Sequence, residues 1–193
     1  MRIIAGKLKG RRLKSFKGHA IRPTPDRARE SLFNIIGDSI IESSFLDLFA
    51  GTGAVGIEAL SRGASEAVFI ESSPSACKLI SANTEICGLN IRAHDVESSS
   101  IFLIKKEVVP GIRDLERQKK SFDFIFLDPP YREGLYQPVL SLIWKSSILK
   151  PDSWTIAEHD SKERLELPEI GLKPFRVARS GDTSFSLFRK ETE

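Results

Sequence analysis

The sequence has few of the residues that build metal centres and disulfide frameworks. It contains two cysteines and three histidines among 193 residues. Cys77 and Cys87 lie in one predicted helix without a CxxC spacing, so we interpret them as reduced, buried thiols. His19, His94 and His159 are scattered without the spacing of metal ligands. The sequence therefore predicts no metal site and no disulfide.

Long apolar runs are also missing. No uninterrupted apolar stretch approaches the ~20 residues that span a bilayer, and residues 1–7 lack the sustained apolar region of a signal peptide. The chain is 40% hydrophobic and 28% charged, as in ordinary globular proteins, and its length suits one well-buried core. We expect a cytoplasmic protein with a single domain over residues 1–193, no membrane partner and no obligate protein partner.

Acidic residues are absent from the first 25 positions. That segment carries eight basic residues, and because the whole chain has a net charge of +3, residues 26–193 are net −5. Such segregation favours a polyanionic partner, although a solvated basic face is the alternative. We predict a basic N-terminal extension at residues 1–25 and a catalytic core at residues 26–193. The candidate phosphate contacts are Lys7, Lys9, Arg11 and Arg12.

The order of predicted elements is that of an α/β sheet. Residues 2–5 and 11–14 predict a small N-terminal β-hairpin, and residues 175–178 and 184–188 predict a C-terminal antiparallel hairpin around Gly181-Asp182. Apolar runs predict strands at residues 45–49, 67–70, 91–93, 122–127 and 154–158. Between them, helices are predicted from Pro25-Asp26 to near Gly37, from the end of the loop at residues 50–56 to residue 62, and at residues 74–87, 101–108 and 135–148.

A glycine-rich loop follows the first predicted strand of the core. Gly51-x-Gly53-x-x-Gly56 opens a helix, which is the context of a nucleotide-binding loop. Phe49 stands at its start, and Glu71 follows the next strand, where an acid can bind both ribose hydroxyls. These features fit an NAD loop as well as an S-adenosylmethionine loop. The alternative is a glycine turn that serves only close packing.

Two acids favour S-adenosylmethionine over NAD. Asp47 falls inside a strand, where a dinucleotide fold would place another apolar residue. An acid there suits the cationic amino group of a methionine moiety. Asp95 is predicted to end the third strand and to accept a hydrogen bond from the adenine amine, although a turn or cap aspartate is an equal alternative.

Asp128-Pro129-Pro130-Tyr131 directly follows the predicted strand at residues 122–127. Two prolines cannot continue a β-ladder, and each holds the preceding residue extended. Asp128 is thus placed at the carboxyl edge of the sheet, where α/β folds bind ligands. Its carboxylate and the Pro129 carbonyl can accept both protons of a planar amine, while Tyr131 stacks on a flat partner. The alternative is a proline-terminated strand whose aspartate caps a turn.

These motifs belong together with several others along the chain: Met1-Arg2-Ile3-Ile4-Ala5-Gly6, Gly10-Arg11-Arg12-Leu13, Arg22-Pro23-Thr24-Pro25-Asp26-Arg27-Ala28-Arg29-Glu30-Ser31-Leu32-Phe33, Asp47-Leu48-Phe49-Ala50-Gly51-Thr52-Gly53 and Gly181-Asp182-Thr183. In combination they resemble the bacterial 16S rRNA guanine-N2 methyltransferases of the RsmD type, almost from end to end. One departure is Ser180, where that family often has an aromatic residue.

The resemblance implies a class I methyltransferase fold with a seven-stranded, mostly parallel sheet. It also implies methyl transfer from S-adenosylmethionine to the N2 amine of one guanine in 16S rRNA, within a small-subunit assembly particle. In that setting Asp128, Pro129, Pro130 and Tyr131 would form the catalytic loop. We expect Arg22 and Thr24 to line the target pocket, with a stiff linker as the alternative.

Three rival functions remain open at this point. Other amino-methyltransferases, acting on adenine N6 in RNA or DNA or on a protein glutamine amide, share the Asp-Pro-Pro-Tyr geometry. A nucleotide-dependent oxidoreductase would leave Asp47 and the Asp-Pro-Pro-Tyr loop without a role. A non-catalytic RNA-binding module would not need the cofactor and amine motifs together.

Overall fold

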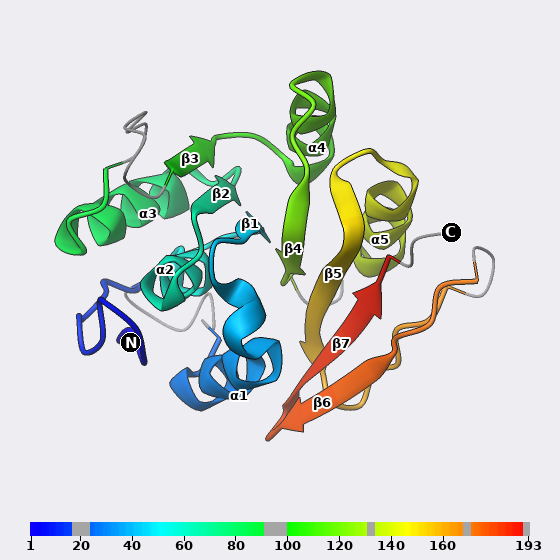
Figure 1. The fold of residues 1–193 in the computed structure, drawn as a ribbon, viewed down its shortest axis with the longest axis horizontal. Coiled ribbons are helices and arrows are strands. Elements are labelled where there is room, and N and C mark those ends of the chain that lie inside the picture. The colour runs from blue at the N-terminus through cyan, green and yellow to red at the C-terminus, as the bar shows by residue number, and fades with distance from the viewer. Residues whose placement is uncertain (17–23, 91–99, 131–133, 168–170, 191–193) are drawn as a thin grey trace.

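The computed structural model describes residues 1–16, 24–90, 100–130, 134–167 and 171–190. A sheet of seven strands in the order β3-β2-β1-β4-β5-β7-β6 runs through this part of the chain (Figure 1). The strands are β1 (Ser44–Leu48), β2 (Glu66–Ile70), β3 (Ser100–Ile104), β4 (Phe122–Leu127), β5 (Leu149–Asp160), β6 (Arg176–Ser180) and β7 (Thr183–Arg189).

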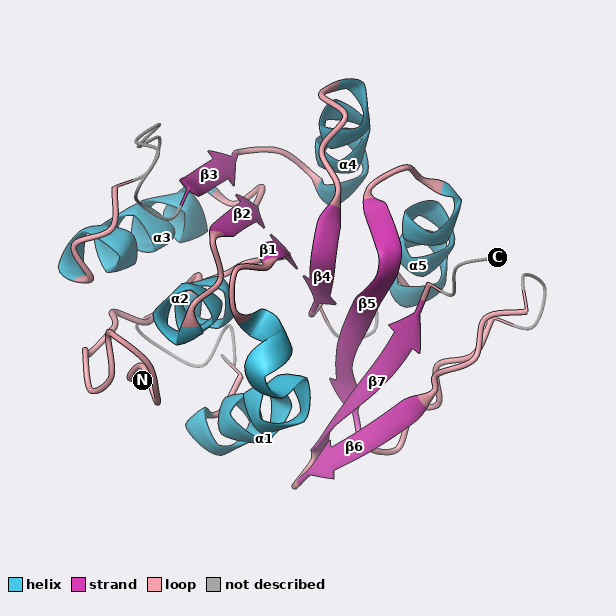
Figure 2. Ribbon diagram, viewed as in Figure 1, coloured by secondary structure: helices cyan, strands magenta, loops and turns pink. Residues whose placement is uncertain are grey.

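Helices cover both faces of the sheet (Figure 2). Helices α1 (Asp26–Ile36), α2 (Ala54–Arg62) and α3 (Pro74–Ile86) bury their apolar sides in one core, and a short 3₁₀ helix, Gly37–Ile40, follows α1. Helices α4 (Val108–Arg117) and α5 (Tyr136–Lys145) pack into a second core on the opposite face. Successive strand residues alternate between the two cores, as Phe45 and Leu46 of β1 do.

Five strands run parallel, and β7 lies antiparallel between β5 and β6. Leu48 at the end of β1 is paired with Ile70 of β2 and Leu127 of β4, and Leu127 in turn is paired with Ala157 of β5. The carboxyl ends of these four strands therefore meet along one edge of the sheet. The predicted fold class, a mostly parallel seven-stranded α/β sheet with a C-terminal antiparallel hairpin, is confirmed.

The prediction for residues 91–108 is wrong in part. The predicted strand at residues 91–93 lies outside the described residues, and the third strand of the sheet is β3, where a helix was predicted. Four consecutive apolar residues, 101–104, carry no helical period, and pairing with β2 makes them a strand. The helix comes later as α4, whose Val108, Ile112 and Leu115 follow helical spacing and are buried.

The N-terminal extension packs against the core. It forms a minimal hairpin with a single β-bridge between Arg2 and Arg12, and Ile3 and Leu13 are buried. The hairpin follows the prediction in outline, but hydrogen bonds to α2 and α3 hold it in place, so it is no free arm. Figure 1 shows this blue segment beside both helices.

Buried Glu58 of α2 anchors the extension. Its carboxylate accepts hydrogen bonds from the backbone N–H groups of Ile4 (2.8 Å) and Ala5 (3.0 Å). It also pairs with Arg29 of α1 at 3.6 Å and Arg62 of α2 at 2.9 Å. The described part of the basic segment therefore has a fixed position on the core.

Within the described residues no helix has the length and hydropathy of a membrane span.

Candidate active site

Four acidic side chains stand at or near the carboxyl edge of the sheet. Asp47 lies within β1, Glu71 follows β2, Asp128 follows β4 and Glu158 lies near the end of β5. Because the strand order is β2-β1-β4-β5, these acids follow one another along the edge as Glu71, Asp47, Asp128 and Glu158. The first three were predicted, whereas Glu158 was not. Within the described residues, histidine, cysteine, aspartate and glutamate side chains form no group that could hold a metal ion.

The glycine-rich loop lies between β1 and α2. Its backbone passes through left-handed conformations at Phe49 (φ 60°), Gly51 (φ 54°) and Gly53 (φ 73°), which accounts for two of the three glycines. A Cβ atom on Gly51 would meet no atom closer than the Phe49 carbonyl oxygen at 3.8 Å. A ligand can thus approach this backbone closely. The third glycine, Gly56, serves packing, because a Cβ there would lie 2.4 Å from the Phe69 ring.

Asp47 is buried beneath this loop. Its Oδ2 atom accepts a hydrogen bond from the Gly56 N–H at 3.0 Å, which ties β1 to the first turn of α2. Burial raises the pKa of Asp47 well above its ordinary value, and the negative charges of Glu71 and Glu158 add to the shift. The structure therefore gives Asp47 a definite role in positioning the loop. Its predicted contact with a methionine ammonium stays a prediction.

Glu71 closes the loop from the side of β2. One carboxylate oxygen accepts from the Gly51 N–H and the other from the Ser73 N–H, both at 2.8 Å. A carboxylate can accept about four hydrogen bonds, so these two backbone donors leave capacity for ribose hydroxyls. The half-buried Glu71 thus fits the predicted cofactor-binding position while also shaping the glycine loop.

Asp128 sits between the cofactor loop and β5. The preceding Leu127 is fully buried, and Pro129 is buried while Pro130 is exposed. Burial raises the pKa of Asp128 well above its ordinary value, and the neighbouring charges of Glu158 and Asp47 raise it further. No hydrogen bond to its carboxylate is found within the described residues. The Asp128 carboxylate therefore has the capacity to accept hydrogen bonds from a ligand.

Three predicted site residues, Tyr131, Asp95 and Arg22, lie outside the described residues. The predicted strand at residues 91–93, which Asp95 was expected to end, lies in the same undescribed range, and the third strand of the described sheet is β3, which ends at Ile104. Lys105, which directly follows β3, occupies the strand-end position instead.

Thr24 lies at the active-site edge, away from the exposed basic residues. Its hydroxyl donates a 2.6 Å hydrogen bond to Glu158 Oε2, and both side chains are buried. Lys7, Lys9, Arg11 and Arg12 are all exposed on the extension, and Arg11 also donates to the Ile86 carbonyl at the end of α3. The structure thus separates Thr24, at the site, from the four basic candidates on the surface.

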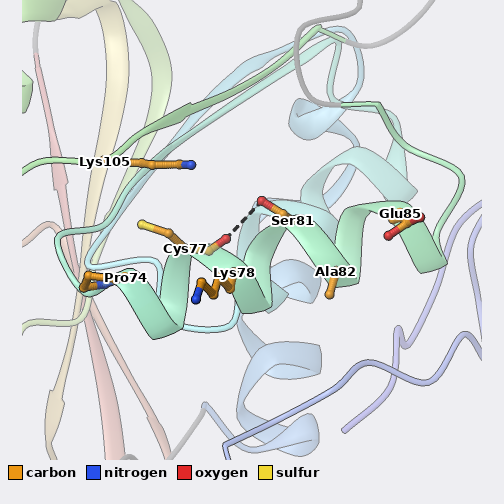
Figure 3. A pocket seen from close by; sticks show the side chains of 7 residues that line it. All are labelled: Pro74, Cys77, Lys78, Ser81, Ala82, Glu85 and Lys105. Atoms are coloured by element: carbon orange, nitrogen blue, oxygen red, sulfur yellow. Dashed lines mark hydrogen bonds between the residues drawn. The ribbon is translucent and has the colours of Figure 1, made fainter.

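A cavity of about 380 Å³ opens beside α3 (Figure 3). Its lining combines one side of α3 with the residue after β3: Pro74, Cys77, Lys78, Ser81, Ala82, Glu85 and Lys105. The Cys77 thiol donates to the Glu71 carbonyl at 3.3 Å, so the cavity borders the strand end that carries Glu71. None of the predicted site residues lines it.

Known proteins that are similar to this chain indicate its family. Residues 1–189 match the sequence profile of the family described as conserved hypothetical protein 95. The chain is 33% identical over 170 residues to the ribosomal RNA small subunit methyltransferase D of Haemophilus influenzae, covering 88% of this chain and 83% of that protein. It is 35% identical over 192 residues to the Bacillus subtilis protein YlbH, covering 98% and 99%.

This chain belongs to the RsmD-type methyltransferase family. The structure of the Escherichia coli protein yhhF superimposes with a TM-score of 0.81 at 26% identity, over 100% of this chain and 99% of that one. The fold is that of class I methyltransferases. The chain is thus an enzyme of the methyltransferase class, as the sequence predicted.

Proposed function

We propose that this enzyme methylates the exocyclic N2 amine of a guanine in the 16S rRNA of the small ribosomal subunit. Relatives named ribosomal RNA small subunit methyltransferase D support an rRNA substrate. The placement of Asp128 supports an amine as the acceptor, and this is the observation on which the proposal depends. Asp128 follows the strand beside the cofactor loop and has an acceptor carboxylate in a buried setting.

The cofactor is S-adenosylmethionine, which supplies an electrophilic methyl group and leaves neutral S-adenosylhomocysteine. The described residues fit it. The open backbone at Gly51 would face the cofactor, and Glu71 would accept from its ribose hydroxyls. Asp47 lies buried beneath the loop, where the positive charge of a cationic ligand would favour its ionised form.

Catalysis would consist mainly of orienting the amine for an in-line displacement. Asp128 and the Pro129 carbonyl would accept hydrogen bonds from the N2 amine, so that its lone pair points toward the methyl carbon. Tyr131 would stack on the extruded base. The amine becomes acidic once alkylated, so no strong base is needed before attack. Asp128, whose pKa is raised by burial, is suited to take the proton afterwards.

The N-terminal extension would hold the RNA. Lys7, Lys9, Arg11 and Arg12 are exposed on a segment that Glu58 fixes to the core, so their charges are presented at defined positions. Such residues position a nucleic acid through its phosphates without reading its sequence. We propose residues 1–25 as this RNA-contacting extension and residues 26–193 as the catalytic core, together forming one domain.

The wider setting follows from this substrate. A small-subunit assembly particle would be the physical form of the rRNA, and the cytoplasm the place of the reaction. No metal ion and no obligate protein partner enter the proposed chemistry. Arg22 would line the target pocket together with Thr24, which the structure locates beside Glu158.

The proposal is tested by methyl transfer to unmodified 16S rRNA. Small subunits and naked rRNA from a strain that lacks the gene would be incubated with the enzyme and radiolabelled cofactor, and the RNA digested to nucleosides. We expect the label in N2-methylguanosine. Label in N6-methyladenosine would favour the rival adenine enzyme, and label in a glutamine residue of a ribosomal protein would favour the amide enzyme.

A further inference from the structure

Glu158 is the acid at the active-site edge that the motifs leave without a role. The pairing of Leu127 with Ala157 makes Asp128 and Glu158 the next residues of two adjacent parallel strands. Neighbouring strands lie about 4.8 Å apart, so one purine base is wide enough to contact both residues. Glu158 is only 2% exposed, and its charge raises the pKa of Asp128, so the two carboxyl groups lie close to each other.

The strand order places Glu158 on the target side of Asp128. The glycine loop follows β1 and Glu71 follows β2, so the cofactor elements lie on one side of β4. Glu158 on β5 lies on the other side. The methyl donor would be held by the loops after β1 and β2, and the amine by Asp128. The rest of the substrate base would therefore lie on the β5 side.

Two hydrogen bonds hold Glu158 in position. The Thr24 hydroxyl donates to Oε2 at 2.6 Å, and the Tyr136 hydroxyl donates to the Glu158 main-chain carbonyl at 2.7 Å. A glutamine amide oxygen would accept from Thr24 equally well and would not carry a charge into a buried place. A carboxylate differs from that amide in having no hydrogen-bond donor. A side chain that only accepts hydrogen bonds is what a ligand with donor groups would require.

We propose that Glu158 selects guanine, by accepting a hydrogen bond from the N1–H of the base whose N2 amine is bound by Asp128. The inference rests on the function proposed above. Guanine presents two adjacent donors, N1–H and the N2 amine, on one edge, and two adjacent carboxylates accept from both. Adenine presents an acceptor at N1 beside its N6 amine, so a carboxylate would face a lone pair. Asp128 thus selects an amine, and Glu158 selects the base that bears it.

The test replaces the target guanine by 2-aminopurine, which keeps the N2 amine but has an acceptor at N1 and lacks O6. Once analysis of labelled rRNA fragments has located the methylated guanine, ligated rRNAs carrying either base at that position are compared in single-turnover assays. For the native enzyme we expect a strong preference for guanine. In Glu158→Gln the amide can donate to N1 of 2-aminopurine, so the preference should contract by at least about tenfold. The missing O6 affects both enzymes equally and cancels in the comparison.

Glu158→Asp is the matched control, because it keeps two acceptor oxygens on a shorter side chain. We expect it to lower the rate but to retain the native preference for guanine. The affinity of Glu158→Gln for S-adenosylhomocysteine, measured by calorimetry, should stay within about threefold of native, since the residue lies across Asp128 from the cofactor elements. An equal loss on both RNAs in Glu158→Gln would overturn the selection by Glu158 while leaving the proposed function intact. A native enzyme that does not form N2-methylguanosine would overturn both.

Discussion

Buried titratable side chains make the stability of this protein depend on pH. His159 is 1% exposed, and its ring nitrogens lie 2.8 Å from the Asp160 carbonyl oxygen and 2.9 Å from Ser186 Oγ. Burial lowers the pKa of His159, whereas burial raises the pKa values of Asp47 and Asp128. As the pH falls, the low pKa of His159 decreases the free energy of unfolding, whereas the raised pKa values of Asp47 and Asp128 increase it. The contribution of one residue is therefore measured by comparing a variant with the native protein.

We predict that His159 makes the fold less stable as the pH falls. Its pKa is lower in the folded than in the unfolded chain, so the unfolded state takes up the proton more readily. The loss begins near the unfolded value of about 6.5 and grows by at most about 1.4 kcal/mol per pH unit until the folded value is reached. Urea unfolding at pH 7.5 and 5.5 measures it. His159→Gln should lose this part of the pH dependence, and an unchanged difference between the two pH values would contradict the prediction.

We further predict that Asp128→Ala lowers the single-turnover rate by at least about 100-fold, because the amine loses its acceptor. Cofactor affinity should change little, since the glycine loop and Glu71 lie on neighbouring strands. Asp123→Asn is a suitable control, because Asp123 lies at the other end of β4 and pairs with Lys150. A native rate in Asp128→Ala would remove this residue from the mechanism.

Some strands and helices of this fold can be predicted from their own residues more clearly than others. Strand β4 is a run of aromatic and β-branched residues stopped by two prolines, and it was predicted with its observed bounds. The apolar run of β3 was mistaken for a helix, because four apolar residues in a row suit either element. Pairing with β2, a contact between distant segments, makes it a strand. The N-terminal hairpin was foreseen, but not its attachment to α2.

That attachment yields a prediction for the stability of the extension. Glu58→Gln would leave Arg29, also fully buried, with only the more exposed carboxylate of Asp26, and would turn an amide N–H₂ toward one of the two backbone donors, Ile4 and Ala5. We expect the free energy of unfolding to fall by about 3–5 kcal/mol. Asp152→Asn, at an ion pair exposed on both sides, should cost less than about 1 kcal/mol. Similar losses in the two variants by urea denaturation would count against Glu58 as the anchor.

At the scale of the whole molecule, charge is divided between two regions. Residues 1–25 carry a net charge of +8 and residues 26–193 a net charge of −5, and the described residues 1–16 are held against the core. The acids of the core include those at the active-site edge, where they suit a cationic cofactor and a donor-rich base. The basic surface lies beside α2 and α3 (Figure 1). An RNA held there through its phosphates would meet the acidic site only with its extruded base.

We predict that replacing Lys7, Lys9, Arg11 and Arg12 by glutamine weakens RNA binding and flattens its dependence on salt. Each lost phosphate contact should reduce the slope of log K against log salt by about 0.7–0.9. As a control, glutamine at Lys119 and Lys145, exposed at the ends of α4 and α5, should leave the slope unchanged. Fluorescence anisotropy with an rRNA fragment over a range of salt concentrations gives both slopes. Equal slopes for the native protein and the fourfold variant would rule out this role.

Local patterns in the sequence were enough for the class of chemistry. A strand that ends in Asp128-Pro129-Pro130, a glycine loop and Glu71 each depend on residues close together in the chain, and their conformations follow from short-range sterics. The contact between Thr24 and Glu158 joins residues 134 positions apart and depends on which strands are neighbours. Such neighbours are set by the packing of the whole sheet, which no short pattern encodes. Asp128, the proposed amine acceptor, could therefore be predicted from the sequence, whereas the position of Glu158 beside it depends on the pairing of β4 with β5.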